Sequence, residues 1–148
     1  MEYEVSPLTV EPHVLAAIPV HVQIPEIASV FPTLDRVWEL VRREGLDFGH
    51  NVFVYEVESG MAHLAQVGVQ VAAPFESADG IVCTTSPAGQ AATTVHMGAY
   101  DRLGEAHDAV AAWCTANGRQ PAGTSWEVYG DWDDDPAKVR TDIFWLLS

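Results

Sequence analysis

The chain has 148 residues, of which 48% are hydrophobic and 19% charged, the composition of one globular domain large enough to bury a core. Seven basic residues stand against 21 acidic ones, so the formal net charge is −14 and no stretch is basic. That charge argues against direct binding to nucleic acid, whose phosphates require cations, and no apolar run reaches the ~20 residues of a membrane-spanning helix.

The first half of the chain is predicted to fold into strands around one helix. In chain order we expect two short strands between Val5 and Gln23, the second over Ala17–Gln23, a helix over Phe31–Glu44, and a hairpin of strands over Asn51–Glu58 and Met61–Val71. The helix is indicated by apolar residues at i, i+3, i+4 and i+7, namely Leu34, Val37, Trp38 and Val41.

The second half is predicted to repeat this order. We expect a short strand over Ile81–Thr84, a strand over Ala91–Met97, a helix over Asp101–Ala116, and hairpin strands over Thr124–Gly130 and Thr141–Leu147. The inner face of the helix is marked by Leu103, Ala106, His107, Val110, Trp113 and Cys114. Segments 72–80, 85–90 and 133–136 are predicted to be loops.

The two halves of the sequence resemble each other. Ala16–Val22 recurs 75 residues later as Ala91–Met97, and Trp38 and Trp113 keep the same offset. We therefore predict one α+β domain over residues 1–148, built from duplicated β-α-β-β units at about 7–71 and 81–147. Pseudo-twofold symmetry would join the units in an antiparallel barrel-like sheet with the helices packed outside and a cleft between the halves.

Glu127 is the strongest candidate for a functional residue. Period two places Glu127 and Tyr129 on one face of their strand and Trp126 on the other, so both faces carry an aromatic ring and are expected to be covered. A carboxylate there would be desolvated, which raises its pKa unless a cation or hydrogen-bond donors compensate. The alternative is an edge strand with a solvated glutamate. The repeat aligns Phe53 with Glu127, so the halves differ at this position.

Aromatic residues gather around the predicted hairpins. They are Phe53, Tyr55, Tyr100, Trp126, Tyr129, Trp132, Phe144 and Trp145. Rings around one acid would suit a flat lipophilic cation, with about 0.5–2 kcal/mol from each ring face. The alternative is that these rings are ordinary core residues, the role that we expect for Trp38 and Trp113.

We predict neither a metal site nor a cofactor. His21 and His96 are equivalent in the repeat, but neither belongs to an HxxxH or HExxH motif, which favours structural roles. Residues Asp131–Asp135 resemble the start of a calcium loop but lack its glycine and closing glutamate, which indicates a solvated acidic loop. No nucleophile elbow or phosphate-binding glycine motif is present.

The cysteines and the first residues of the chain predict a cytoplasmic location. Cys83 and Cys114 are not part of a CxxC motif, which favours reduced, buried thiols. The acidic start Met1–Glu4 is not followed by the apolar run of a signal peptide.

An ordered set of short motifs resembles the GyrI-like effector-binding domain family. The set comprises Val67–Val71, Val95–Asp101, the helix ending in Trp113, Trp126–Tyr129 and Thr141–Ile143. The resemblance covers about Pro7 to Leu147. One departure is that the usual His-x-Gly-Pro-Tyr becomes His96-Met-Gly-Ala-Tyr100, which removes a proline that would stiffen the turn.

The resemblance implies the duplicated fold and three classes of function. Members fused to DNA-binding domains bind drugs, often lipophilic cations, through a buried glutamate and aromatic rings, and Glu127 falls on the motif of that glutamate. Some stand-alone members resemble hydrolases that open the cyclopropane of DNA-alkylating natural products with acidic and tyrosine side chains. One stand-alone member acts on DNA gyrase by protein contact.

The leading expectation is a stand-alone cytoplasmic protein that binds or sequesters an aromatic, possibly cationic, small molecule. Glu127 would contact it by charge, and ring faces would come from Tyr129, Tyr55, Phe53 and Trp145. If the protein is instead a hydrolase, which we favour less, Glu127 would act with Tyr55 and Tyr129. In a third alternative the acidic surface at Asp131–Asp135 meets a protein partner. We expect no direct nucleic-acid or membrane partner, and the oligomeric state stays open.

Overall fold

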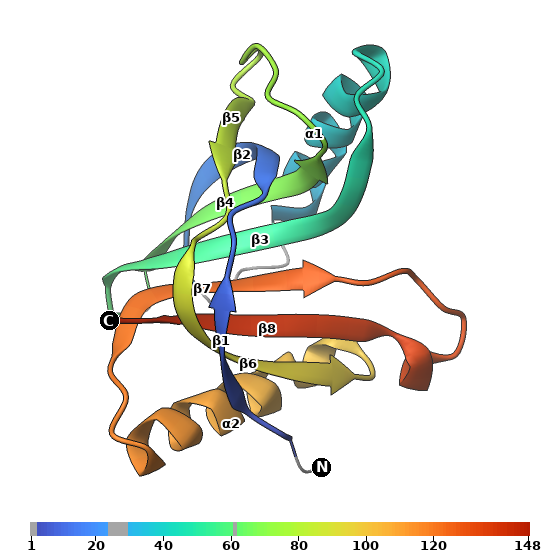
Figure 1. The fold of residues 1–148 in the computed structure, drawn as a ribbon. Coiled ribbons are helices and arrows are strands. Elements are labelled where there is room, and N and C mark those ends of the chain that lie inside the picture. The colour runs from blue at the N-terminus through green and yellow to red at the C-terminus, as the bar shows by residue number, and fades with distance from the viewer. Residues whose placement is uncertain (1–2, 24–29, 61) are drawn as a thin grey trace. The chain divides into compact units, whose positions relative to one another are not determined.

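The computed structural model describes residues 3–23, 30–60 and 62–148. They form an α+β protein in which the β-α-β-β pattern occurs twice, so the predicted fold class and duplication are confirmed (Figure 1). The chain divides into two compact units. Unit 1 comprises residues 3–11 and 88–148, and unit 2 lies within residues 12–87.

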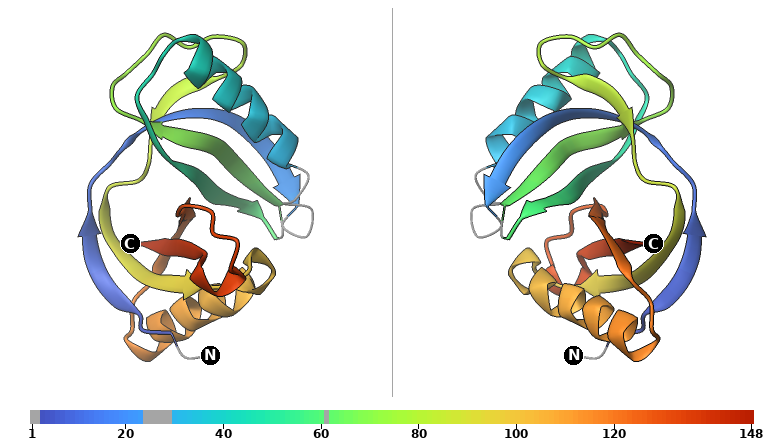
Figure 2. Two further views of the ribbon diagram at one scale, coloured as in Figure 1. Left: turned by 90° about the vertical axis from the view of Figure 1, so that its right-hand side faces the viewer. Right: turned by 90° about the vertical axis from the view of Figure 1, so that its left-hand side faces the viewer.

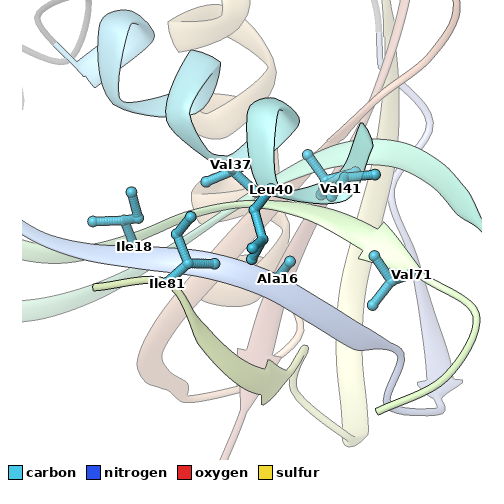
Figure 3. Packing of buried hydrophobic residues seen from close by; sticks show 8 residues of the cluster. Ala16, Ile18, Val37, Leu40, Val41, Val71 and Ile81 are labelled. Carbon is cyan, nitrogen blue, oxygen red and sulfur yellow. The ribbon is translucent and has the colours of Figure 1, made fainter. Parts of the chain in front are cut away.

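Unit 2 is a four-stranded sheet with one helix. Its elements are β2 (Val14–Gln23), α1 (Phe31–Arg43), β3 (Phe48–Ser59), β4 (Ala62–Val71) and β5 (Val82–Thr85). The strands pair in the order β5-β2-β4-β3, and every pair is antiparallel. Figure 3 shows how α1 covers one face of this sheet: Val37, Leu40 and Val41 lie over Ala16, Ile18, Val71 and Ile81, and all seven are buried.

Unit 1 repeats this arrangement. Its elements are β1 (Ser6–Val10), β6 (Gly89–Met97), α2 (Leu103–Ala116), β7 (Pro121–Tyr129) and β8 (Arg140–Leu147). The strands pair in the antiparallel order β1-β6-β8-β7. The helix α2 lies beside β6 (Figure 2). The core between α2 and the strands is formed by Ala92, Ala106, Val110, Cys114, Ile143 and Leu147.

The observed elements lie close to the predicted ones. Helix α1 ends one residue before the predicted boundary, and α2 begins at Leu103 because a single 3-10 turn, Tyr100–Arg102, precedes it. Strand β3 starts earlier than predicted, at Phe48, and an irregularity in its pairing with β4 follows directly. The predicted start of the first hairpin's second strand, Met61, lies outside the described residues.

Two strands pair outside the half of the sequence in which they lie. Strand β1 pairs with β6 of the second half, and β5 pairs with β2 of the first half. The predicted boundaries at 7–71 and 81–147 follow chain order, whereas strand pairing also depends on tertiary contacts. Within each unit the strands run in an open linear order, so the sheet is not the closed barrel that the term barrel-like suggests.

The chain passes between the units twice, near Pro12 and Pro87. On the unit 2 side the two passages are hydrogen-bonded to each other. The His13 N–H donates to Ser86 Oγ at 2.9 Å, and the Ser86 N–H donates to the His13 carbonyl at 2.9 Å. Because Ser86 is buried, these two hydrogen bonds are kept from solvent, and they join the segment at His13 to the segment at Ser86.

In the part of the chain that the structure describes, no helix has the length and apolar character needed to cross a bilayer. Both cysteines are free. Cys114 is buried on the inner face of α2, as predicted, and its burial raises the pKa of the thiol. Cys83 is only partly buried.

Candidate ligand-binding site around Glu127

Glu127 belongs to unit 1 and is buried, with 5% of its surface exposed. It sits on β7 directly opposite Ile143 of β8, and its carboxylate reaches His107 of α2. The next residue back, Trp126, is also buried and stacks on Phe144, with ring centroids 5.1 Å apart and planes 10° from parallel. The strand is covered on both faces, as its sequence pattern predicted.

Three side chains organise the Glu127 carboxylate. His107 Nε2 lies 2.9 Å from Oε2, and the Tyr129 hydroxyl donates to Oε1 at 2.6 Å. The indole N–H of Trp145 donates in turn to His107 Nδ1 at 2.9 Å. Both carboxylate oxygens therefore have a donor, and such charge-assisted hydrogen bonds offset part of the cost of burying the charge.

The hydrogen bonds assign the protonation of His107. An indole N–H can only donate, so Nδ1 of the imidazole must accept and carries no proton. The ring proton is then on Nε2, where it is donated to Glu127. His107 is thus neutral in this arrangement, and the cluster of Glu127, His107, Tyr129 and Trp145 keeps one negative charge.

A second tyrosine extends the aromatic surroundings of the carboxylate. The ring of Tyr100 meets that of Tyr129 edge to face, with centroids 5.5 Å apart. Tyr100 is 37% exposed, and desolvation raises the pKa of its phenol. The rings of Tyr129 and Tyr100 therefore connect the buried carboxylate with the surface.

Thr141 adds a buried polar atom next to this cluster. It lies directly opposite Tyr129 in the β7–β8 ladder and is fully buried. Its hydroxyl finds no hydrogen-bond partner among the described residues. A buried hydroxyl without a partner costs about 1–3 kcal/mol of stability.

We expect Thr141→Val, which keeps the branched shape, to raise the free energy of unfolding by about 1 kcal/mol. Urea denaturation followed by circular dichroism measures the change. Thr93→Val is the matched control, because the Thr93 hydroxyl donates to the Ile143 carbonyl at 2.9 Å and its loss should cost about 1 kcal/mol. A Thr141→Val protein less stable than wild type would show that the hydroxyl has a partner, such as a bound water.

Unit 2 carries apolar residues at three of the four positions that correspond to the cluster and a tyrosine, Tyr55, at the fourth. Val69 corresponds to Trp145, because Val69 lies opposite Asn51 on β3 and Trp145 lies opposite Ser125 on β7. In the same way Ala65, opposite Tyr55, corresponds to Thr141, opposite Tyr129. By the same repeat Phe53 corresponds to Glu127 and Pro32 to His107. The tyrosine is common to both units, whereas Glu127, His107 and Trp145 are particular to unit 1, and the shared fold does not require them.

The structure brings together Glu127, Tyr129 and Trp145, three of the five predicted ligand contacts. Trp145 was predicted to supply a ring face, and its indole N–H also holds His107. Phe53 and Tyr55 are buried on β3 of unit 2, where the Phe53 ring lies 6.0 Å from that of Phe31. Their predicted roles stay predictions.

Sequence reasoning missed His107 as a member of the site. The residue stood on the predicted inner face of its helix among apolar residues. A polar side chain in such a place needs a hydrogen-bond partner, and that requirement was the available signal. The partner could not be named, because it depends on which strand packs beneath the helix.

The histidines that are equivalent in the repeat have different surroundings. His96 is buried, where Nε2 donates to the Ala99 carbonyl at 2.9 Å and Nδ1 meets the Tyr3 hydroxyl at 2.8 Å. His21 is exposed and lies 2.8 Å from Glu58. The described residues contain no group of three or more metal-ligating side chains.

The acidic loop stabilises its own backbone. The Asp133 carboxylate accepts the N–H of Asp135 at 2.8 Å, and the Asp135 carboxylate accepts the N–H of Ala137 at 3.1 Å. The second bond caps a 3-10 turn over Pro136–Lys138. Two of the acidic side chains thus have a local structural role in a segment predicted to be a solvated loop.

No protein-family model and no curated protein matches the sequence. Solved structures do match it, among them the EcmrR C-terminal domain, with a TM-score of 0.85 and 18% identity over 100% of this chain and 99% of that chain. The chain has the GyrI-like fold. In the EcmrR–DNA complex the likeness covers 57% of the EcmrR chain.

Two further structures with this fold are informative. SAV2435, solved bound to tetraphenylphosphonium, matches with a TM-score of 0.67 and 14% identity over 100% of this chain and 94% of that chain. A hydrolase from Listeria innocua matches with a TM-score of 0.60 and 7% identity over 98% of this chain and 92% of that chain. Identities this low establish the shared fold alone.

Proposed function

We propose that the protein binds a lipophilic organic cation and that the Glu127 carboxylate recognises its charge. The observation that carries the proposal is a buried carboxylate whose donors on α2 and β7, His107 and Tyr129, are both neutral. These two neutral donors stabilise the anion without cancelling its charge. The fold relative SAV2435, solved with tetraphenylphosphonium, supports this class of ligand.

The magnitudes fit a ligand that carries both a charge and aromatic surface. At an effective dielectric constant of ~20, a cation ~4 Å from the carboxylate gains ~4 kcal/mol, which desolvation reduces. A micromolar ligand requires roughly 8 kcal/mol. Ring faces such as those of Tyr100, Tyr129 and Trp145 would supply about 0.5–2 kcal/mol each, and apolar burial the remainder.

The same surroundings suit a diffuse charge better than a metal ion. A hard cation such as calcium takes about six to eight oxygen ligands, whereas this cluster offers one carboxylate with both oxygens already accepting hydrogen bonds. An organic cation needs no coordination shell, and it gains from contact with aromatic rings.

We expect Glu127→Gln to weaken binding of tetraphenylphosphonium at least tenfold, or about 1.4 kcal/mol. Glutamine keeps the size of the side chain and removes the charge, and isothermal titration calorimetry measures the affinity directly. The control is Glu56→Gln, which removes one charge from an exposed position on β3 and should leave the affinity unchanged. Equal affinity of wild type and Glu127→Gln would refute recognition by this carboxylate.

A hydrolase is the second candidate, and the short contact between Tyr129 and Glu127 favours it. A tyrosine hydroxyl 2.6 Å from a carboxylate is an arrangement that transfers protons. A hydrolase from Listeria innocua has the same fold. Incubation with cyclopropane-bearing electrophiles, followed by mass spectrometry, separates the two functions. A product that forms with wild type and is lost in Tyr129→Phe would establish turnover, whereas binding without product supports the leading proposal.

A further inference from the structure

We infer that His107 and Trp145 are positioning residues that fix the charge of the site, so that it selects cations over neutral molecules of the same shape. The inference rests on the cation-binding function proposed above. It concerns how the chain prevents His107 from cancelling the charge of the carboxylate with which it forms a hydrogen bond.

A histidine beside a glutamate would ordinarily form an ion pair when it takes up a second proton. His107 Nε2 is 2.9 Å from Glu127, close enough for the imidazolium to neutralise the carboxylate. A neutral pair of this kind would attract an organic cation weakly. The charge state of His107 therefore decides whether the site is anionic.

Trp145 opposes that second proton. Its indole N–H points at His107 Nδ1 from 2.9 Å, so a proton on Nδ1 would place two N–H groups against each other. The neutral Nε2–H form satisfies both neighbours at once. The rings of His107 and Trp145 are 6.1 Å apart and tilted by 39°, so the hydrogen bond, and not parallel stacking, defines their contact.

Because Glu127 and His107 are both largely buried, the charge state of His107 has a large effect on a bound cation. The side chain of Glu127 is 7% exposed and that of His107 is 24% exposed. Solvent screens charges poorly at such positions, so cancelling the carboxylate would be felt by a bound cation. Trp145 corresponds to Val69 and His107 to Pro32 in unit 2, which shows that the fold does not by itself require this pair.

Other titratable groups of unit 1 around α2 are engaged elsewhere. On β6, His96 bonds to Tyr3 and the Ala99 carbonyl. In the turn before the helix, Arg102 pairs with Glu105 at 2.9 Å, which lowers the pKa of Glu105. Asp101 and Asp108 are exposed, and Tyr100 packs on Tyr129. On β8, the helix-facing Thr141, Ile143 and Trp145 are uncharged. Among the described residues of unit 1, the charged group placed against His107 is Glu127, at 2.9 Å.

The test removes the indole N–H and keeps an aromatic ring. Affinities for tetraphenylphosphonium and for neutral triphenylphosphine oxide are measured from about pH 8 to about pH 6 in wild type, Trp145→Phe and Trp145→Phe/His107→Gln. Wild type should bind the cation with a flat profile. Trp145→Phe should lose about tenfold in cation affinity toward acid pH, because Nδ1 is free to take a proton. The neutral probe should show no such trend.

Trp145→Phe/His107→Gln is the rescue variant, because the glutamine side chain can donate a hydrogen bond to Glu127 and cannot become charged. It should restore the flat profile. A Trp145→Phe profile as flat as that of wild type would overturn the inference. The inference would also be overturned if Trp145→Phe lost affinity equally for the cation and the neutral probe at every pH. Trp145 would then be a packing residue only.

Nitrogen-15 NMR of the wild-type histidines gives an independent readout that needs neither a variant nor a ligand. His107 should show the neutral Nε2–H form across the same pH range, and an imidazolium signal near neutral pH would overturn the inference. If wild type failed to bind tetraphenylphosphonium while this neutral form was present, the proposed function would fail and the assignment of His107 would stand.

Discussion

Trp38→Ala is expected to lower the free energy of unfolding by about 3 kcal/mol, and Trp113→Ala by about 1 kcal/mol less. Both tryptophans are partly buried against the core of their own unit. Trp38 also donates its indole N–H to Asn51 Oδ1 at 2.9 Å and meets the Phe48 ring edge to face at 4.8 Å. Equivalence in the repeat alone would predict equal losses, and these added contacts produce the difference.

Urea denaturation followed by circular dichroism measures both losses without relying on tryptophan fluorescence. Trp38→Phe is the control, because it keeps a ring beside Phe48 and removes only the hydrogen bond to Asn51. It should account for about 1 kcal/mol of the loss. If Trp38→Ala cost no more than Trp113→Ala, the bond to Asn51 would contribute nothing measurable.

Gly68→Ala is expected to destabilise the protein by about 2–3 kcal/mol, because β2 leaves no room for a methyl group. A Cβ at Gly68 would lie 2.7 Å from the Ala16 carbonyl oxygen and 2.8 Å from the Ala17 side chain. Gly68 pairs directly with Ala17 on one side and with Val52 on the other. Backbone in the middle of a paired sheet cannot move without breaking ladder hydrogen bonds.

Gly104→Ala is the matched substitution for comparison. A Cβ at Gly104 meets nothing within 4 Å, and the residue lies in the first turn of α2. Alanine should therefore stabilise the helix by about 0.5 kcal/mol. Thermal denaturation of the two variants should show shifts of opposite sign. A Gly68→Ala protein as stable as wild type would mean that β2 and β4 can separate at little cost.

The secondary structure was predictable because its signals are local. The i, i+3, i+4, i+7 spacing of apolar residues located α1 to within one residue. Alternation along Trp126–Tyr129 indicated a strand covered on both faces, whereas burial of Glu127 was preferred to a solvated edge position only with the repeat and the family resemblance, and Glu127 is buried. Each of these patterns depends on neighbours within a few positions of the same segment.

Partnerships between distant segments were not predictable from such signals. Nothing within Ser6–Val10 specifies β6 as its partner, and the residues of that strand are mostly exposed. The bond between His107 and Glu127 likewise depends on the packing of α2 over β7, and the role of Trp145 depends on the register of β8. Registers and packing are set by the whole fold.

The chain leaves unit 1 near Pro12 and returns to it near Pro87, so unit 2 is an insertion in the sequence of unit 1. Unit 2 is one continuous stretch whose two ends are joined by the His13–Ser86 hydrogen bonds. Unit 1 is interrupted between Glu11 and Ala88, directly beside Val10 and Gly89, which already face each other as a ladder pair. Unit 2 therefore has the topology of a cassette inserted into a β-hairpin. A tight turn linking Val10 to Gly89 would close the gap that excision leaves, and the Glu127 cluster would remain on an uninterrupted chain.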